Sequence, residues 1–204
     1  MNKSFVNSLL IIAVFLFIYF ESNPSLRIPI IQGEEANSGR LALIVMNDLP
    51  DSSEVVFLGR HFPLCIDPKH GALECYILLP FLLLGGATPE ALRIGPLLFG
   101  AMTILFTFWF AGRIFNPYVG VIAAFLLAIN GFFISIVKMG ATCGFSMPIF
   151  SMASLLLFLK YSKNKKNMYY YLGMFILGLG FNIRGYFIWF IIALFFTGLL
   201  LRRR

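Results

Sequence analysis

The acidic residues of this 204-residue chain are confined to one stretch of the sequence. All nine Asp and Glu residues lie between Glu21 and Glu90, and both histidines lie there too. Residues 91–204 contain no Asp, Glu or His. Chemistry that needs a carboxylate or an imidazole must therefore occur in residues 21–90, and the rest of the chain must hold that stretch in position.

The composition is that of a membrane protein. Apolar residues make up 59% of the chain and charged residues 12%, whereas about 25% of the residues in a soluble domain are charged. Leu, Ile and Phe occur in long blocks rather than at a helical or strand period, as expected for helices surrounded by lipid. We therefore predict an all-α integral membrane protein, a polytopic helical bundle in contact with membrane lipids.

The net charge of +7 does not indicate nucleic acid as a partner. Lys and Arg collect at the ends of the apolar runs, where they orient helices by the positive-inside rule. No feature of the sequence indicates an oligomeric state.

Six apolar runs are predicted to be transmembrane helices. The first has no small-residue cleavage pattern at Tyr19-Phe20-Glu21, so we interpret it as an uncleaved span rather than a signal peptide. Residues 1–204 are then a single membrane domain, with an outer-face loop at 21–90 and five further spans in 91–204. The six runs are residues 5–20, 91–111, 119–137, 145–159, 168–181 and 186–201.

Two further helices are expected within the outer-face loop. Residues 34–48 place Leu41, Ile44 and Val45 on one helical face, which predicts a juxtamembrane helix on the membrane surface. Residues 73–86 are apolar but short. If they crossed the membrane, the basic clusters at 160–166 and 202–204 would lie outside, against the positive-inside rule. We therefore predict a short re-entrant or interfacial helix there, with both termini cytoplasmic in a bacterial plasma (inner) membrane.

A pair of carboxylates opens the predicted surface helix. Glu34 and Glu35 follow Gly33, and negative charge at a helix N-terminus is favourable by about 0.3–1 kcal/mol. Helix capping alone is therefore one explanation. The alternative is a catalytic role, as a general base or, for Glu34, as an anchor for a divalent cation.

Several cations are candidates for binding phosphate. Lys69 and His70 either grip a phosphate or snorkel to the interface. Arg93 and Arg184 lie at the edges of predicted spans, where an anionic ligand or lipid phosphate explains them equally. Glu74 lies within an apolar run and needs a cavity or a partner.

Two cysteines, Cys65 and Cys75, flank His70 in the sequence. Both face an oxidising compartment in the predicted topology, so a disulfide between them is one arrangement to test.

The order of the motifs resembles the N-terminal half of the membrane glycosyltransferases of the GT-C class. The group it resembles contains the lipid A aminoarabinose transferases and the protein O-mannosyltransferases (ArnT-like or PMT-like), and the resemblance covers nearly the whole chain. The segments that carry it are Gly33-Glu34-Glu35-Ala36, Lys69-His70-Gly71-Ala72-Leu73, residues 90–100, Gly112-Arg113-Ile114-Phe115 and residues 178–185.

The resemblance implies a function and a site. It implies transfer of a hexose or pentose from a polyprenyl-phosphate donor to an acceptor on the outer face, with inversion at the sugar carbon. Glu34 takes the place of the family's catalytic Asp and Glu35 that of the following Glu. His70, with Lys69, falls on the motif near the lipid phosphate, and Arg184 keeps the cation of a Lys-Gly turn. Some relatives use a divalent cation and some do not.

The sequence departs from the family pattern in three places. Glu34 replaces an Asp, Gly71 replaces a proline, and residues 138–144 lack a second acidic residue. Family members are also roughly twice as long, so the chain resembles the N-terminal part of a longer protein. These departures are consistent with a non-catalytic membrane scaffold subunit. A lipid or anion transporter is the other alternative, although acidic residues are absent from the later spans.

Overall fold

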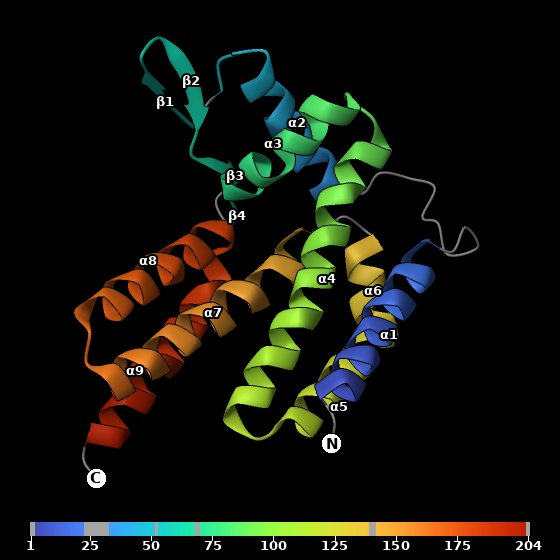
Figure 1. Ribbon diagram of the computed structural model, residues 1–204. Helices are drawn as coiled ribbons and strands as arrows, with labels where there is room; N and C mark the ends of the chain where they lie inside the picture. Colours follow the sequence, from blue (N-terminus) through green and yellow to red (C-terminus); the bar gives the residue numbers. More distant parts are fainter. Residues whose placement is uncertain (1–2, 23–32, 52, 68–69, 139–141, 203–204) are drawn as a thin grey trace.

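The computed structural model describes residues 3–22, 33–51, 53–67, 70–138 and 142–202. The described chain is all-α apart from two small hairpins. Long helices form a bundle, and a cap made of the segment 33–85 covers one end of it (Figure 1). The bundle helices are α1 (Lys3–Ser22), α4 (Pro89–Ile114), α5 (Pro117–Ala128), α6 (Gly131–Lys138), α7 (Thr142–Asn164), α8 (Asn167–Ile183) and α9 (Ile188–Arg202).

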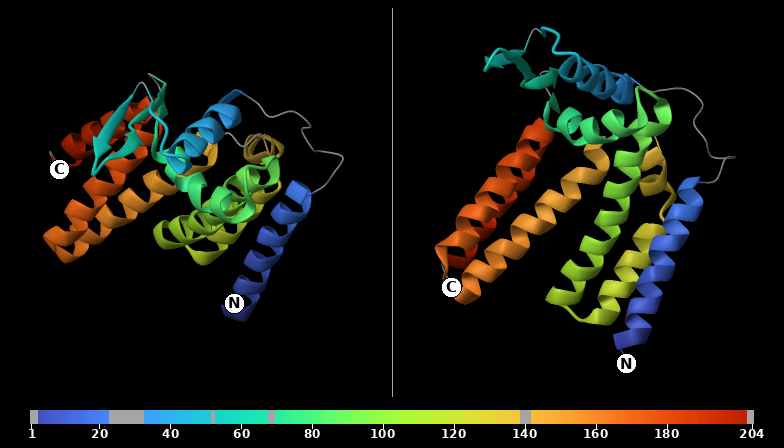
Figure 2. Two further views of the ribbon diagram at one scale, coloured as in Figure 1. Left: turned by 90° about the horizontal axis from the view of Figure 1, so that it is seen from above. Right: turned by 45° about the horizontal axis from the view of Figure 1, so that its top comes forward.

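The cap lies at the opposite end of the bundle from the start of α1 and the end of α9 (Figures 1 and 2). We call that opposite end the basal end. With α5 and α6 taken together, successive bundle helices run alternately towards and away from the cap. The cap elements are α2 (Gly33–Met46), β1 (Glu54–Phe57), β2 (Arg60–Pro63), β3 (Cys65–Asp67), β4 (His70–Gly71) and α3 (Leu73–Gly85).

One helix is by itself long and apolar enough to cross a membrane among the described residues. This is α4, whose 26 residues extend for about 39 Å. The bent pair α5–α6 meets the same criterion only when it is counted as one span. The apolar stretches of α1 and α9 are shorter. The predicted all-α architecture is confirmed at this level, and a bundle of six spans remains a prediction.

The predicted span at 119–137 is wrong as a single helix. It is broken at Ile129 and Asn130 into α5 and α6, which meet at 57°. The Asn130 Oδ1 atom accepts a hydrogen bond from the Phe133 backbone N–H at 2.8 Å. Because Asn is a favoured N-cap residue, a new helix starts here in place of a continued one.

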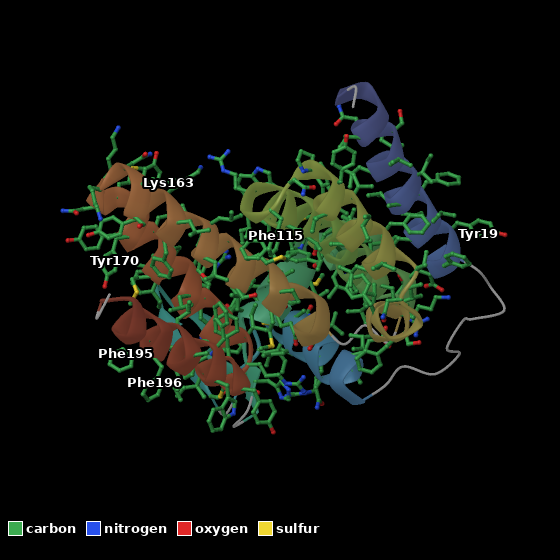
Figure 3. The ribbon with its side chains drawn as sticks, turned by 90° about the horizontal axis from the view of Figure 1, so that it is seen from below. Tyr19, Phe115, Lys163, Tyr170, Phe195 and Phe196 are labelled. Carbon is green, nitrogen blue, oxygen red and sulfur yellow. The ribbon has the colours of Figure 1, made fainter. Side chains whose placement is uncertain are left out.

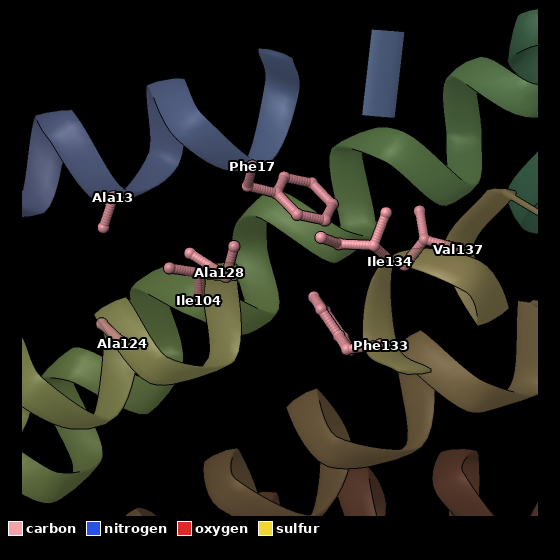
Figure 4. Close-up of a cluster of buried hydrophobic side chains, with 8 residues drawn as sticks. All are labelled: Ala13, Phe17, Ile104, Ala124, Ala128, Phe133, Ile134 and Val137. Carbon is pink, nitrogen blue, oxygen red and sulfur yellow. The ribbon is translucent and has the colours of Figure 1, made fainter. Parts of the chain in front are cut away.

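The bundle core lies where α1 meets α4, α5 and α6 (Figure 4). Phe17 of α1 is fully buried, and its ring lies 5.6 Å from that of Phe133, centroid to centroid. At Gly100 of α4 a Cβ atom would come within 2.7 Å of the Phe17 ring. A glycine in α4 therefore lets α1 approach closely enough to bury an aromatic side chain.

The helix predicted at 34–48 is confirmed as α2, which ends two residues early at Met46, and its place at the membrane surface stays a prediction. Leu41 is fully buried against α3, and Ile44 and Val45 pack on the same cluster. Residues 73–86 form α3, which lies beneath α2 in the cap (Figure 2). At 13 residues, α3 is shorter than the ~20 residues that a membrane crossing needs.

The two hairpins of the cap were not predicted from the sequence. β1 and β2 are joined by Leu58 and Gly59, both with positive φ, at 52° and 74°. Two consecutive positive φ values are typical of the type I′ turn, whose twist matches that of the flanking strands. β3 and β4 form the second hairpin, and β4 leads directly into α3.

Large apolar side chains cover the outside of the bundle. Phe15 of α1 is 67% exposed, Trp189 of α9 is 69% exposed and Phe195 is 63% exposed. Figure 3 shows Tyr19, Phe195 and Phe196 pointing away from the bundle. An exposed apolar surface this extensive marks contact with lipid or with another protein rather than with water.

Candidate functional site

The first turn of α2 carries the two candidate carboxylates. The backbone of Glu34 lies in this turn, and its side chain is outside the described part of the structure. Glu35 points into the cap and is only 2% exposed. Its carboxylate accepts hydrogen bonds from Arg93 of α4, at 2.9 Å from Nε to Oε1 and 3.4 Å from Nη2 to Oε2. The two neighbouring glutamates are thus not equivalent.

Arg93 has an internal partner. The sequence suggested two partners for this residue, an anionic ligand or lipid phosphate, and both lie outside the protein. The structure corrects them, because the guanidinium bonds to Glu35 across 58 residues of sequence. The ion pair fixes the start of α2 against the first turns of α4, and the Arg93 side chain retains 29% exposure.

A second buried polar contact joins α2 to α3. Ser38 Oγ donates a hydrogen bond to Glu74 Oε2 at 3.1 Å, and both residues are at most 3% exposed. Glu74 therefore has the partner that its place in an apolar run requires. Ser38 follows Glu35 by three residues, so both contacts lie on the same face of α2.

The structure brings together His70 and Arg184, two of the residues predicted to bind phosphate. They form an antiparallel β-bridge that joins β4 to the end of α8. Both side chains are half-buried, and the Arg184 guanidinium carbon lies 5.8 Å from the Tyr186 ring centroid. Lys69, the third residue of this predicted group, lies outside the described residues.

Position 71 has no room for the proline that the family resemblance would place there. A Cβ atom at Gly71 would fall on the backbone carbonyl oxygen of Asn182. The Asn182 side chain also accepts a hydrogen bond from the Leu73 backbone N–H at 3.2 Å. Residues 70–73 are therefore held against the end of α8, and only glycine fits at position 71.

The cysteines of the cap are both free thiols, so the suggested disulfide between Cys65 and Cys75 is wrong. Cys75 is buried, and its Sγ donates to the Ala72 carbonyl at 2.9 Å. Burial raises the pKa of the Cys75 thiol to about 12, and the neighbouring Glu74 carboxylate adds to the rise. This thiol is inert at neutral pH, because the thiolate is the reactive form.

The described residues do not fit a divalent cation. Within them, no three His, Cys, Asp or Glu side chains come close enough to hold a metal ion. The carboxylate of Glu35 is already bonded to Arg93. Glu34 as a metal ligand stays a prediction, because its side chain is not described.

Two residues of the site escaped the sequence reasoning. Ser38 and Asn182 are uncharged, and each makes its contact with a residue that is distant in sequence, Glu74 and Leu73 respectively. Asn182 falls within the segment 178–185 on which the family resemblance rests, and this membership could have pointed to it. Ser38 had no such signal.

Comparison with known families matches residues 69–204 to the family described as dolichyl-phosphate-mannose-protein mannosyltransferase. The chain belongs to this family. Its members are membrane glycosyltransferases of the mannosyltransferase type, which implies a lipid-linked sugar donor. The matched residues include His70, Gly71 and Arg184, whereas Glu34 and Glu35 precede them. Searches of curated proteins and of solved structures return no match.

Proposed function

We propose that this protein transfers a hexose or pentose from a polyprenyl-phosphate donor to an acceptor that approaches the cap. In this proposal α1, α4, the α5–α6 pair, α7, α8 and α9 are six membrane spans of one domain. The cap lies on the outer face of a bacterial inner membrane, and both termini are cytoplasmic. The alternation of the bundle helices between the cap and the basal end supports this topology.

In the proposed reaction, Glu34 removes the proton from the acceptor hydroxyl. The acceptor oxygen bonds to the anomeric carbon with inversion, and the bond from that carbon to the phosphate oxygen breaks. His70, Lys69 and Arg184 offset the charge that develops on the departing polyprenyl phosphate. Glu35 is a positioning residue, because its carboxylate is committed to Arg93.

One observation carries this proposal. The cap packs two groups of residues from distant sequence at one end of the bundle, with the start of α2 on α4 and the turn before α3 on the end of α8. The carboxylates belong to the first group and the cations to the second. A base for the acceptor and a positive site for the leaving phosphate are the two requirements of this transfer.

The decisive test is Glu34→Gln in the full-length natural protein, assayed with a polyprenyl-phosphate sugar. We expect kcat to fall by about 10²- to 10⁴-fold, the usual contribution of a general base. Glu90→Gln is the matched control, because Glu90 is an exposed carboxylate in the first turn of α4. Both variants should insert and elute normally, and normal transfer by Glu34→Gln excludes this catalytic role.

The phosphate side of the site is tested with Arg184→Gln. This change removes the guanidinium and keeps the backbone bridge to His70. We expect a lower kcat and a higher KM for the donor, with the KM for the acceptor unchanged. A change in the acceptor KM alone would contradict the proposed role.

The proposed topology is tested by labelling single cysteines with an impermeant reagent from outside intact cells. Leu58→Cys lies at the 88% exposed tip of the β1–β2 hairpin, and Ser162→Cys lies in the last turns of α7. We expect labelling of the first and not of the second. The reverse pattern overturns the orientation.

A non-catalytic scaffold subunit is the second candidate. The buried pair of Glu35 with Arg93 favours it, because this pair removes one of the two candidate carboxylates from chemistry. The two functions differ in the Glu34→Gln assay. A scaffold retains the activity of its complex in that variant, whereas an enzyme loses it.

A further inference from the structure

A basic pocket lies at the basal end of the bundle, far from the cap. It has a volume of about 230 Å³ and opens between the last turns of α4 and α7. Its lining combines three cations with apolar and aromatic side chains. The lining includes Trp109, Arg113, Leu159, Lys160 and Lys163.

Within the described part of the chain, the three cations of this pocket have no acidic partner. Residues 91–204 contain no Asp or Glu, and within the described part of the chain none of the three makes an ion pair. Like charges around one cavity repel each other. An anion from outside the protein would relieve this repulsion.

The Lys160 side chain is held in place by two rings. Its Nζ atom lies 5.9 Å from the Trp109 ring centroid on α4 and 5.8 Å from the Tyr169 centroid on α8. Cation–π contacts of this kind orient an ammonium group without neutralising it. The positive charge of Lys160 thus stays available to a ligand in the pocket.

The surroundings of the pocket favour a lipid over a free anion. Leu159 is 42% exposed and Trp109 is 45% exposed, while Phe115, just past Arg113 on α4, is 71% exposed. Figure 3, seen from the basal end, shows Phe115 and Lys163 on this side of the molecule. Exposed aromatic and apolar side chains beside cations are typical of a site at the level of lipid headgroups.

Helix ends alone do not account for these observations. Cations in the last turn of a helix are favourable, and Arg113 and Lys163 occupy such positions in α4 and α7. That effect does not require side chains from two helices to share one cavity. It also does not require Lys160, one turn before Lys163, to be clamped between rings.

We propose that this pocket binds the phosphate headgroup of an anionic phospholipid in the leaflet at the basal end. Arg113 offers a planar fork to phosphate oxygens, and Lys160 and Lys163 offer single ammonium groups. The inference rests on the proposed membrane topology and is independent of the transfer chemistry at the cap.

The test is native mass spectrometry of the purified full-length protein titrated with phosphatidylglycerol. The double variant Lys160→Gln/Lys163→Gln is compared with Lys165→Gln/Lys166→Gln, which removes the same charge from the exposed α7–α8 turn next to the pocket. We expect binding to weaken about 30-fold in the pocket variant, the size expected for two lysines at a membrane surface. The turn variant should lose clearly less, because neither Lys165 nor Lys166 lines the pocket.

Three outcomes overturn the proposal. Equal losses in the two double variants would mean that diffuse surface charge binds the lipid. Equal binding of phosphatidylcholine would mean that the pocket does not select a headgroup with a net negative charge. Full displacement by inorganic phosphate would mean that the ligand is a free anion. Trp109 fluorescence in a Trp189→Phe background is a second readout, which should change with phosphatidylglycerol and not with phosphatidylcholine. Glu34→Gln should bind the lipid normally, so failure of the transfer proposal is distinguishable from failure of this one.

Discussion

The charged residues of the cap and of the basal end have different surroundings. Glu35 of the cap pairs with Arg93 of α4, and the His61 ring and the Glu54 carboxylate are hydrogen-bonded at 2.8 Å. At the basal end, Arg113, Lys160 and Lys163 share one pocket with no carboxylate. The charged groups of the cap stabilise the fold, whereas those of the basal end face the proposed lipid.

The comparison also separates stability from function. A buried ion pair is costly to break, because the remaining charge is left without a partner in a medium of low polarity. An exposed cation with no partner in the protein contributes little to folding. Removal of single charges from the two ends should therefore have very different effects on the free energy of unfolding.

Arg93→Ala should have the largest effect on stability. The change leaves the Glu35 carboxylate buried without its guanidinium, and loss of one partner of a buried pair costs about 3–5 kcal/mol. The free energy of unfolding in detergent measures this loss. The double variant Glu35→Leu/Arg93→Leu should recover most of it, and a failure to recover would mean that the pair itself stabilises the cap.

Gly71→Ala should have the next largest effect. The new Cβ atom would meet the Asn182 backbone, which cannot move aside as a side chain can. We expect a loss of about 3 kcal/mol, at the upper end for an overpacked site. Gly178→Ala in α8 is the control, since nothing lies within 4 Å of its Cβ position. Equal stability of the two variants would show that β4 is not held against α8.

The Cys75 thiol should make the cap sensitive to alkaline pH. Its pKa is about 12 in the folded protein, against 9.0 for an unperturbed cysteine thiol. The unfolded chain loses this proton first, so the contribution to stability is fully present below pH 9 and falls as the pH rises towards 12. Alkylation of Cys75 at pH 8 should be about 1000-fold slower than that of an unperturbed, exposed thiol. Fast labelling at pH 8 would contradict its burial.

Lys163→Ala should have the smallest effect on stability. Lys163 is exposed and lies in the last turn of α7, where a cation contributes about 0.3–1 kcal/mol. The same unfolding assay, run without anionic lipid, measures it. A loss as large as that of Arg93→Ala would mean that the basal cations build the fold, and the contrast between the two ends would not hold.

Much of the fold was predictable because hydrophobic pattern is a local signal. The surface helix and its buried face at Leu41 followed from spacing, as did the short helix at 73–86. The break at Asn130 did not, because one polar residue barely changes the hydropathy of a long apolar run. The β1–β2 hairpin did not either, since its turn places Leu58 at positive φ, which Leu rarely adopts.

The functional roles of the candidate site residues stay a prediction, and the contacts that these residues make were harder to foresee. Glu74 in an apolar run signalled that it needs a partner, but Ser38 lies 36 residues away and carries no charge. Arg93 was expected to have an anionic partner, and that partner is Glu35, one of the residues predicted to be catalytic. Pairings across such separations depend on how helices pack, which the local pattern does not encode.

The contact between residues 70–73 and the end of α8 has a consequence for the order in which the cap forms. The Leu73 backbone and the Asn182 side chain that it bonds are separated by 109 residues. At about 5–20 residues per second, Asn182 is synthesised roughly 5–20 s after Leu73. During that interval the segment that becomes β4 has no α8 to join. Completion of the cap is therefore a late event in biosynthesis, and a nascent chain halted before α8 would carry Lys69 and His70 without Arg184.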